Sequence, residues 1–483
     1  MKKIILPIGL VLFLGFSFTF IAFLLNKPEW IQAKLMHEGL PILNGQVVFS
    51  STVYPANQSG IITLPKNLVG SQVGASAPGY FIDQILVKPD HFYWNLRKIG
   101  KDNPDYEWVS SSQGKGNCLE CHQGIVEQWQ RGAHANGWKQ SGFLRMYKSE
   151  HKEWSLWHDY PEGRTVCVAC HAPQLGPEDP ALEDATLLKE SRFQGIECDF
   201  CHKVSGIKDR DPGLTHGRDM FVLQRPSQGN GQVFFGGLAD AVRGDNAYAP
   251  VFHQSVFCAS CHEGTIFGQK VYTTFSEWKA SPSFAKGDSC QSCHMKPDGK
   301  TRNIAPSKGG IERHPDSLAS HDLMPGGKLS MLRKCMTLSV SVAEVANHQK
   351  EIRIHLLARD VGHKVPTGHV DHHLLILLET SSRESRSTLI QGPLLPLWMD
   401  ENLRGRTGVC LGRPNLNEEG NQLVPFWRAM QEPVDNRLEP EKPREYRWVV
   451  PNDTGEISVK LYYRAGWHQQ SEKILVHERT IRP

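Results

Sequence analysis

The chain has 483 residues, enough for two or three domains, and only 39% of them are hydrophobic, which is low for that size. The formal net charge of +3 is nearly balanced, so the composition excludes a strongly basic nucleic-acid-binding protein and does not indicate a strongly acidic partner. Twelve cysteines are present. Their spacing carries most of the functional information.

The first 26 residues have the pattern of a membrane anchor. Lys2 and Lys3 precede an uncharged apolar run from Ile4 to Leu25, which is long enough to cross a bilayer. No small-x-small cleavage pattern follows, so we expect an uncleaved, single-pass transmembrane helix rather than a cleaved signal peptide. The positive-inside rule then places the rest of the chain on the periplasmic, or extracytoplasmic, face of the cytoplasmic membrane.

Residues 27–110 come before the cysteine motifs. They contain two β-branched runs, 46–54 and 60–64, bounded by Asn, Pro and Gly. We expect a lead-in with short strands and no attached cofactor.

Residues 111–325 carry the motif Cys-x-x-Cys-His five times. The copies are Cys118-Leu-Glu-Cys121-His122, Cys167-Val-Ala-Cys170-His171, Cys198-Asp-Phe-Cys201-His202, Cys258-Ala-Ser-Cys261-His262 and Cys290-Gln-Ser-Cys293-His294. This motif attaches c-type haem. The two cysteine sulfurs add to the two vinyl groups of the porphyrin, and the histidine binds the iron from one side. The sequence therefore predicts five covalently bound haem c groups.

Paired cysteines also occur in structural zinc sites and in thiol redox pairs. Neither kind of site needs a histidine directly after the second cysteine. All five copies have one, so we favour haem over zinc and over thiol chemistry.

Between the motifs, residues 111–325 are rich in Gly and Pro, with short helical stretches such as 123–131. We expect a mainly helical, loop-rich pentahaem cytochrome c domain in which the porphyrins take the place of a side-chain core. The second and third motifs, and the fourth and fifth, are separated by the shorter gaps. This spacing predicts that the haems of these two pairs lie next to each other.

The chain has 22 histidines, and only five of them belong to the motifs. This surplus favours a second histidine on most irons, which gives six-coordinate haems without an open site for a substrate. The leading candidates are His134, which follows a helical stretch, and His321, in a loop after the fifth motif. The further candidates for this distal position are His253, His363, His158 and His216. For each of them the alternative is a surface histidine.

From residue 326 to 483 the pattern changes to strand-like runs, several of which alternate polar and apolar residues. The runs are 336–344, 351–357, 444–450, 457–463 and 473–477. We predict an all-β sandwich of immunoglobulin-like type. Cys335 and Cys410 lie here, and either form a disulfide or stay as two buried thiols.

Several stretches resemble a broad family of multihaem c-type cytochromes related to the tetrahaem cytochrome of ammonia oxidisers and to hydroxylamine oxidoreductase. They are Cys167-Val-Ala-Cys-His-Ala-Pro173, Gly195-Ile-Glu-Cys-Asp-Phe-Cys-His202, Phe257-Cys-Ala-Ser-Cys-His-Glu263, Thr274-Phe-Ser-Glu-Trp-Lys-Ala-Ser281, Cys290-Gln-Ser-Cys-His-Met295 and Gly362-His-Lys-Val-Pro-Thr-Gly368. The resemblance implies a membrane-associated or periplasmic electron carrier with a β-sandwich tail. Some relatives are reductases or oxidases with one five-coordinate haem. A weak internal repeat places Ser283 where the first copy has His134, so the distal ligand of one haem stays open.

The sequence favours an electron carrier over a catalyst, because no catalytic constellation is recognisable. We expect a membrane-anchored pentahaem cytochrome that moves electrons between a membrane or quinone-linked donor and a periplasmic or extracellular acceptor. One alternative is a reductase or oxidase of a small nitrogen or sulfur compound at one open-coordinate haem. Another is an electron-transfer subunit of a larger oxidoreductase complex. The expected partners are redox proteins and the cytoplasmic membrane, not nucleic acid.

Overall fold

The computed structural model describes residues 30–147, 154–161, 164–176, 195–227, 229, 231–380, 390–467 and 471–482. The chain forms two compact units. The first comprises residues 1–106 and 224–250, and the second comprises residues 107–223 and 251–483.

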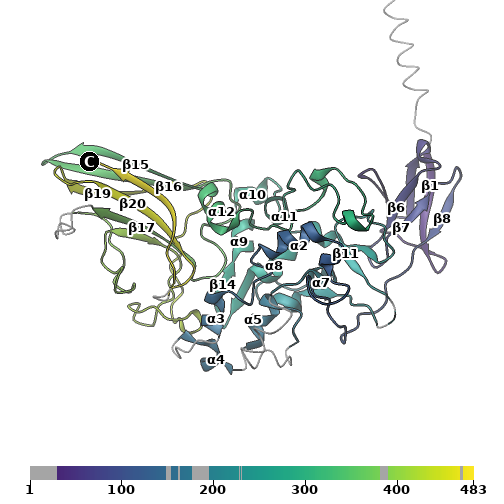
Figure 1. Cartoon of the computed structure of the whole chain (residues 1–483), viewed down its shortest axis with the longest axis horizontal. Coiled ribbons are helices and arrows are strands. Elements are labelled where there is room, and N and C mark those ends of the chain that lie inside the picture. Colours follow the sequence, from purple (N-terminus) through teal and green to yellow (C-terminus); the bar gives the residue numbers. More distant parts are fainter. Residues whose placement is uncertain are drawn as a thin grey trace, which may run out of the picture. The chain divides into compact units, whose positions relative to one another are not determined.

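The first unit contains a sandwich of two four-stranded sheets, drawn in purple and blue in Figure 1. One sheet contains β2 (Leu40–Pro41), β1 (Trp30–His37), β5 (Ile61–Pro65) and β8 (Phe92–Asn95); the other contains β4 (Thr52–Pro55), β3 (Gln46–Phe49), β6 (Gln72–Ser76) and β7 (Asp83–Leu86). Strand β1 alternates exposed and buried residues, so that Ile31, Ala33 and Leu35 face inward. Period-two alternation of this kind gives each sheet one apolar face, and the two apolar faces form a common core.

A segment from later in the chain completes this unit. Within residues 224–250, β11 (Phe234–Gly236) pairs in parallel with β12 (Asn246–Tyr248), and Ala247 forms a β-bridge with Phe81. The Arg225 guanidinium donates two hydrogen bonds to the Asp102 carboxylate, at 2.9 and 2.6 Å. The first unit is therefore built from two separate pieces of chain.

The motif-bearing part of the second unit consists of short helices joined by loops. The α helices are α2 (Gln123–Gln130), α3 (Ser141–Tyr147), α4 (Leu156–Asp159), α5 (Arg164–His171), α7 (Cys198–Cys201), α8 (Val256–His262), α9 (Thr274–Lys279), α10 (Pro282–Ala285), α11 (Cys290–His294) and α12 (Gly327–Cys335). Short strand pairs lie among them: β9 (Val204–Ile207) with β10 (Phe221–Leu223), and β13 (Glu263–Ile266) with β14 (Gln269–Thr273). Figure 1 shows these helices gathered in one region of the unit.

The prediction of a mainly helical domain is wrong. The described ranges contain ten α helices, none longer than nine residues, against 21 strands. The physical reason is local. A Cys-x-x-Cys-His motif needs only one helical turn. In addition, a Gly or Pro, which disfavours continuation of a helix, follows within three residues of the ends of α2, α5, α10 and α11. The structure also gives no support to the predicted transmembrane helix. Residues 1–26 lie outside the described residues, and no helix in the described part of the chain is long and apolar enough to cross a membrane.

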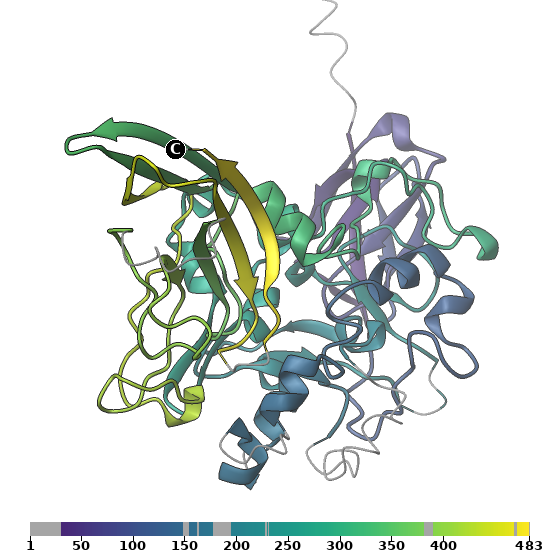
Figure 2. The same cartoon turned by 60° about the vertical axis from the view of Figure 1, so that its left-hand side comes forward.

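The last part of the second unit is a sandwich of seven antiparallel strands, the green and yellow strands of Figure 2. One sheet has the order β15 (Met336–Val345), β16 (Gln349–Ala358), β19 (Arg444–Pro451); the other has the order β18 (Gly408–Leu411), β17 (His373–Thr380), β20 (Ile457–Arg464), β21 (Ile474–Ile481). Seven antiparallel strands divided in this way are typical of immunoglobulin-like domains. Strand β16 turns Ile352, Ile354 and Leu356 into a core shared by both sheets.

Cys335 and Cys410 are both free thiols, so the structure supports the second of the two sequence alternatives. Burial raises the pKa of Cys335 to about 11 and that of Cys410 to about 12. Both thiols therefore stay protonated at neutral pH and act as small apolar side chains.

The core of the first unit gives a stability prediction. Leu35 is fully buried in β1, and Leu35→Ala should lower the free energy of unfolding of that unit by about 2–5 kcal/mol, because it removes buried methyl groups and leaves a cavity. Urea unfolding monitored by tryptophan fluorescence measures the change. Val53→Ala is the control, since Val53 is 50% exposed and should cost less than about 1 kcal/mol. Equal losses for the two variants would contradict the placement of this core.

Candidate functional site

The histidines of three motifs share one hydrogen-bonding arrangement. Nδ1 lies 2.9 Å from the Ile304 carbonyl oxygen in His122, 3.0 Å from that of Gly137 in His171, and 3.1 Å from that of Leu323 in His294. A ring nitrogen that faces a carbonyl oxygen carries the proton, so the opposite nitrogen, Nε2, keeps its lone pair. This is the tautomer that binds a metal ion through Nε2, with the backbone fixing the orientation of the ring.

Three of the five motif histidines face a second histidine. The ring centroids of His262 and His134 are 6.2 Å apart, those of His202 and His321 are 6.4 Å apart, and those of His294 and His363 are 6.2 Å apart. A metal–nitrogen bond of about 2.0 Å, with the ring nitrogen about 1.1 Å from its centroid, places two imidazoles on one metal ion about 6.2 Å apart. The three pairs have the separation that a shared iron requires.

The protonation states of these rings agree with that role. Burial, together with neighbouring histidines, lowers the pKa of His134 to about 4, of His262 to about 3 and of His321 to about 4. Burial is also the main cause of the lowered pKa of His363. All four rings are thus neutral at physiological pH, and a neutral ring is the form that binds iron. The residues present fit a c-type haem at the third, fourth and fifth motifs.

His134 is positioned by the chain that leads into the third motif. Its carbonyl oxygen accepts a hydrogen bond of 2.8 Å from the Ile196 N–H, and the indole N–H of Trp129 donates to the Ile196 carbonyl oxygen at 2.9 Å. A Cβ at Gly195 would lie 2.0 Å from the His134 carbonyl oxygen, so only glycine permits this approach.

His321 is positioned by helix α2. Its backbone N–H donates to the Gln128 side-chain oxygen at 2.8 Å, and Gln128 lies on α2 directly after the first motif. The same loop is held near the fifth motif, where the Ser320 N–H donates to the Met295 carbonyl oxygen at 3.1 Å.

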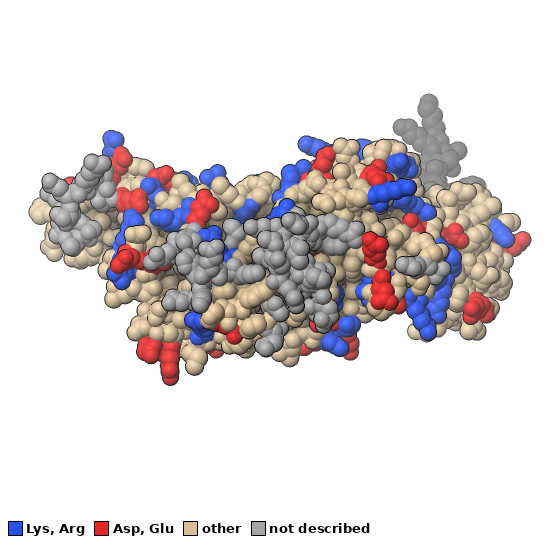
Figure 3. All heavy atoms as spheres, turned by 60° about the horizontal axis from the view of Figure 1, so that its bottom comes forward, with Lys and Arg blue, Asp and Glu red and all other residues tan. Residues whose placement is uncertain are grey.

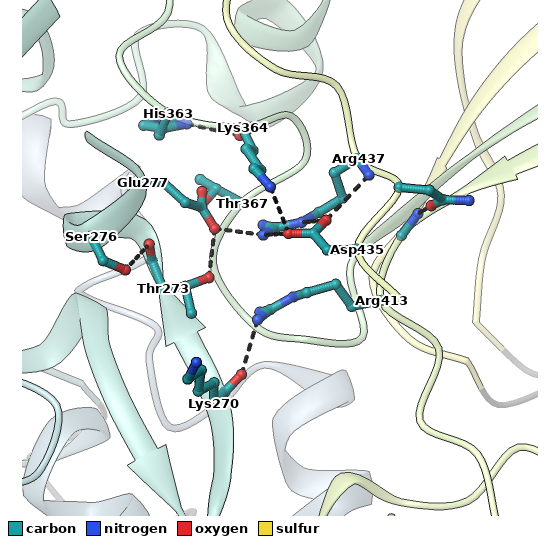
Figure 4. A network of polar contacts seen from close by, with 12 residues as sticks. Lys270, Thr273, Ser276, Glu277, His363, Lys364, Thr367, Arg413, Asp435 and Arg437 are labelled. Atoms are coloured by element: carbon teal, nitrogen blue, oxygen red, sulfur yellow. Dashed lines mark hydrogen bonds and ion pairs between the residues drawn. The ribbon is translucent and has the colours of Figure 1, made fainter. Parts of the chain in front are cut away.

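His363 comes from the sandwich, on a loop that a buried ionic network holds (Figure 4). Arg437, 3% exposed, lies 2.6 Å from the Glu277 carboxylate of α9, which is 6% exposed, and 2.8 Å from Asp435. Lys364 reaches Asp435 at 2.9 Å, and the Thr367 hydroxyl donates to Glu277 at 2.8 Å. Burial raises the pKa of Asp435, but hydrogen bonds from Arg437 and Lys364 outweigh it and hold that pKa well below its usual range. The network holds the loop directly after His363, through Thr367 to Glu277 of α9 and through Lys364 to Asp435.

This loop also accounts for the missing histidine of the internal repeat. Ser283 occupies that position in α10, and Gly362 packs against it: a Cβ at Gly362 would lie 3.4 Å from the Ser283 Cβ. The next residue of the loop, His363, faces the fifth motif histidine. The sandwich therefore places a histidine, His363, beside the position at which the repeat has Ser283 instead of a histidine.

The remaining predicted ligands are not brought opposite a motif histidine in the described ring pairs. His158 is 51% exposed and lies 3.2 Å from Asp159. His216 precedes the 3₁₀ helix η6 (Gly217–Met220), and its buried Nδ1 has no hydrogen-bond partner in the described part of the chain. His253 follows Phe252, whose ring stacks on His202 with centroids 5.7 Å apart. Among the described residues no second imidazole faces His122 or His171 at the metal-bridging distance.

The motif cysteines show which motifs adjoin. Cys118 lies close enough to Cys198 to shift its pKa, and the same holds for Cys261 with Cys170 and for Cys258 with Cys290. The fourth motif thus adjoins both the second and the fifth, and the first adjoins the third. The fourth and fifth motifs adjoin, as the sequence spacing predicts, and the third motif lies beside the first.

Sequence reasoning did not consider the histidines of the segment Gly368-His-Val-Asp-His-His373. His369 and His372 are half-buried in the second unit, and desolvation lowers the pKa of both. Their ring centroids are 6.2 Å apart, with planes at 56°. The concentration of three histidines in six residues was the available sequence signal.

Comparison with known proteins agrees with this chemistry. Residues 117–203, which include the first three motifs, match the family described as cytochrome c554 and c-prime. Among solved structures, the penta-haem cytochrome c552 from Thermochromatium tepidum is 18% identical, with 75% of this chain and 97% of that chain covered and a TM-score of 0.49. The human F-spondin reeler domain is 12% identical, over 31% of this chain and 86% of that one, with a TM-score of 0.17. No curated protein matches the chain.

The five motifs and the family match support a multihaem c-type cytochrome with covalently bound haem c and a role in electron transport. They do not show the predicted relation to hydroxylamine oxidoreductase.

His363→Ala should convert one haem from low-spin to high-spin, because the fifth motif loses the ring opposite His294. Electron paramagnetic resonance of the ferric protein measures the change. The control is His355→Ala, since His355 is 45% exposed on the sandwich and pairs only with Glu445 among the described ion pairs. An unchanged spectrum for His363→Ala would remove His363 from the ligand set.

Arg437→Gln should lower the free energy of unfolding by about 3–5 kcal/mol, because it leaves the buried carboxylate of Glu277 without its cation. It should also raise the high-spin fraction, since the loop that carries His363 loses its attachment. Lys442→Gln is the matched control: Lys442 is 73% exposed in its pair with Glu439, and removing it should cost less than about 1 kcal/mol. Urea unfolding and the same spectra compare the two variants.

Proposed function

We propose that this chain binds five c-type haems and carries electrons through them between a donor and an acceptor protein outside the cytoplasm. The observation that carries the proposal is the set of three histidine pairs, each at the separation of two ligands on one iron. An iron held by two histidines keeps its coordination when it is oxidised or reduced, which suits electron transfer and leaves no position for a substrate. When bound, the haems supply the redox chemistry, and the protein holds, orients and insulates them.

The contacts between the motif cysteines support a path. Each thioether lies at the edge of its haem, so neighbouring cysteines bring haem edges together. The pairs Cys118–Cys198 and Cys258–Cys290 join the first motif to the third and the fourth to the fifth. Cys201 lies within electrostatic range of Cys261, which links the third motif to the fourth. Electrons would then pass through the motifs in the order one, three, four, five, with the second motif branching from the fourth.

The two ends of this path lie near the surface. Cys293 and Ser292 of the fifth motif are exposed, and residues 113–116, directly before the first motif, are exposed as well. The inner cysteines Cys201 and Cys261 are more strongly buried. The first and fifth haems are therefore the proposed points of exchange with redox partners. On the face drawn in Figure 3 the acidic and basic side chains are interspersed, which favours partner recognition by short-range complementarity over long-range steering.

The proposed location outside the cytoplasm follows from the cofactor. Cytochromes c acquire their thioether bonds on the outer side of the cytoplasmic membrane. The ten motif cysteines must stay reduced until attachment, and an oxidising compartment is then harmless to them, because thioethers do not form disulfides.

The count of haems tests the proposal directly. The wild-type protein should contain five haem equivalents in the pyridine haemochrome assay and take up five electrons in a reversible redox titration. The double variant Cys290→Ala, Cys293→Ala should give four of each. Cys335→Ala is the matched control: it also removes a cysteine, but one outside the motifs, and should keep five. Fewer than five equivalents in the wild type, or haems that cannot be reversibly reduced, would refute the proposal.

A further inference from the structure

The segment that contains the third motif buries three charged side chains within seven residues. Glu197 is 3% exposed, Asp199 is 1% exposed and Lys203 is 0% exposed. Charged side chains of these kinds are seldom buried so completely, because moving a charge from water into the protein interior costs free energy. Two acids and one base are therefore held beside this motif at a cost to stability.

Both carboxylates bind the chain that leads into the first motif. The Ser111 N–H donates to Oε2 of Glu197 at 2.8 Å, and the Val109 N–H donates to Oδ2 of Asp199 at 2.9 Å. The other carboxylate oxygen of Asp199 accepts a hydrogen bond from the Lys203 ammonium group. The two acids thus lie between the third motif and residues 109–111.

Ser111 continues this connection to both motifs. Its carbonyl oxygen accepts a hydrogen bond of 3.0 Å from the N–H of Leu119, inside the first motif. Its hydroxyl oxygen accepts one of 3.0 Å from the N–H of Cys198, the first residue of the third motif. The carboxylate of Glu197 is therefore fixed against a residue that contacts both motifs.

The electrostatic effect of the two acids extends to the first motif. Contact with Cys198 and burial raise the pKa of the Cys118 thiol, and the charges of Asp199 and Glu197 add to the rise. Both carboxylates are thus close enough to act on the edge at which the first haem is attached.

The fourth and fifth motifs have a different surrounding. Contact with Cys170 and burial raise the pKa of Cys261, and contact with Cys258 lowers that of Cys290. No carboxylate in the described part of the chain contributes to either shift. The negative field at the first and third motifs has no counterpart at these two cysteines.

The charges near the distal histidine of the fifth motif also balance. In the network of Figure 4, the acids Glu277 and Asp435 are matched by the bases Arg437 and Lys364. This network holds the loop of His363 without an excess of negative charge.

A buried negative charge lowers the reduction potential of a nearby haem. Oxidation adds one positive charge at the iron, and a carboxylate in a medium of low dielectric constant stabilises that charge. One unit charge at about 10 Å changes the equilibrium constant for reduction about tenfold, at an effective dielectric constant of about 20. A difference in buried charge along a row of haems therefore gives electron flow a direction.

We infer that Glu197 and Asp199 lower the reduction potentials of the haems of the first and third motifs, so that electrons enter the path at the first motif and leave it at the fifth. The step at entry is a one-electron transfer from a reduced donor protein to a ferric haem, without making or breaking a bond. The inference rests on the proposed function, since it needs the five haems, and it adds the direction of flow and the residues that set it.

The test is a spectroscopic redox titration of the full-length holoprotein, described by five one-electron steps. In Glu197→Gln the two steps of lowest potential should move to higher potential by about 59 mV, which corresponds to a tenfold change for a one-electron couple. Asp199→Asn should move the same two steps in the same direction. Each amide has nearly the size of the acid that it replaces, and its oxygen can still accept the backbone hydrogen bond.

Two further variants separate charge from structure. Lys203→Gln removes a positive charge from the same region and should move the same steps to lower potential, whereas a loss of packing has no such dependence on sign. Glu120→Gln is the matched control: Glu120 lies within the first motif, but it is exposed and accepts a hydrogen bond of 2.8 Å from the Gly116 N–H. Water and salt screen its charge, so the equilibrium constants should change less than about twofold.

The double variant Cys290→Ala, Cys293→Ala assigns the steps to haems. It lacks the fifth haem and should keep both low-potential steps. Loss of one of those steps would place the low-potential end at the fifth motif and reverse the inferred direction.

Two other results would overturn the inference. One is a titration of Glu197→Gln that matches the wild type. The other is a shift of Lys203→Gln in the same direction as Glu197→Gln, which would trace both shifts to altered packing. If Asp199→Asn fails to fold because its ion pair with Lys203 is broken, Glu197→Gln and its control Glu120→Gln still decide. Failure of the proposed function would look different, because the haemochrome assay would then give fewer than five equivalents per chain.

Discussion

Two histidines on one iron must hold their rings about 6.2 Å apart, and this separation governs how the second unit is folded. The structure meets it three times, with rings that come from distant parts of the chain. The lowered pKa values of His134, His262 and His321 keep these rings neutral, and each distal histidine is fastened by backbone hydrogen bonds or by its loop. The short helices and long connections follow from this constraint, because these segments only have to position a histidine ring opposite a motif histidine.

The same constraint explains why the sandwich belongs to the haem-binding unit. Its loop places His363 opposite His294 of the fifth motif, and a few residues later it brings His369 within electrostatic range of His171 of the second. The ion pair of Glu277 with Arg437 holds the loop, and both side chains are almost fully buried. Removing either one would leave the other as an unpaired buried charge, which strongly destabilises a fold. The sandwich therefore contributes residues that lie next to the motifs, and these residues are in the connections between its strands.

Local chemistry could be predicted from the sequence and long-range placement could not. The five motifs are each contained in one helical turn, so five residues suffice to identify them. The alternation in 351–357 likewise predicts a half-buried strand, which β16 confirms.

The overall helical content was overestimated, because a motif turn does not need a full helix around it. His134 faces the histidine of the fourth motif although it follows the first motif in the chain, and no pattern in the sequence indicates that pairing. The contact of the third motif with the first was likewise not predicted from the spacing.

The discontinuous first unit has a consequence for biogenesis. Its sandwich comprises residues before position 107, but β11 and β12 are made only after the third motif. During translation the cysteines of three motifs are therefore synthesised before the last segment of the first unit. A genetic truncation that removes residues 30–106 would leave β11 and β12 without the strands they cover, so this unit cannot be exchanged as a simple N-terminal cassette.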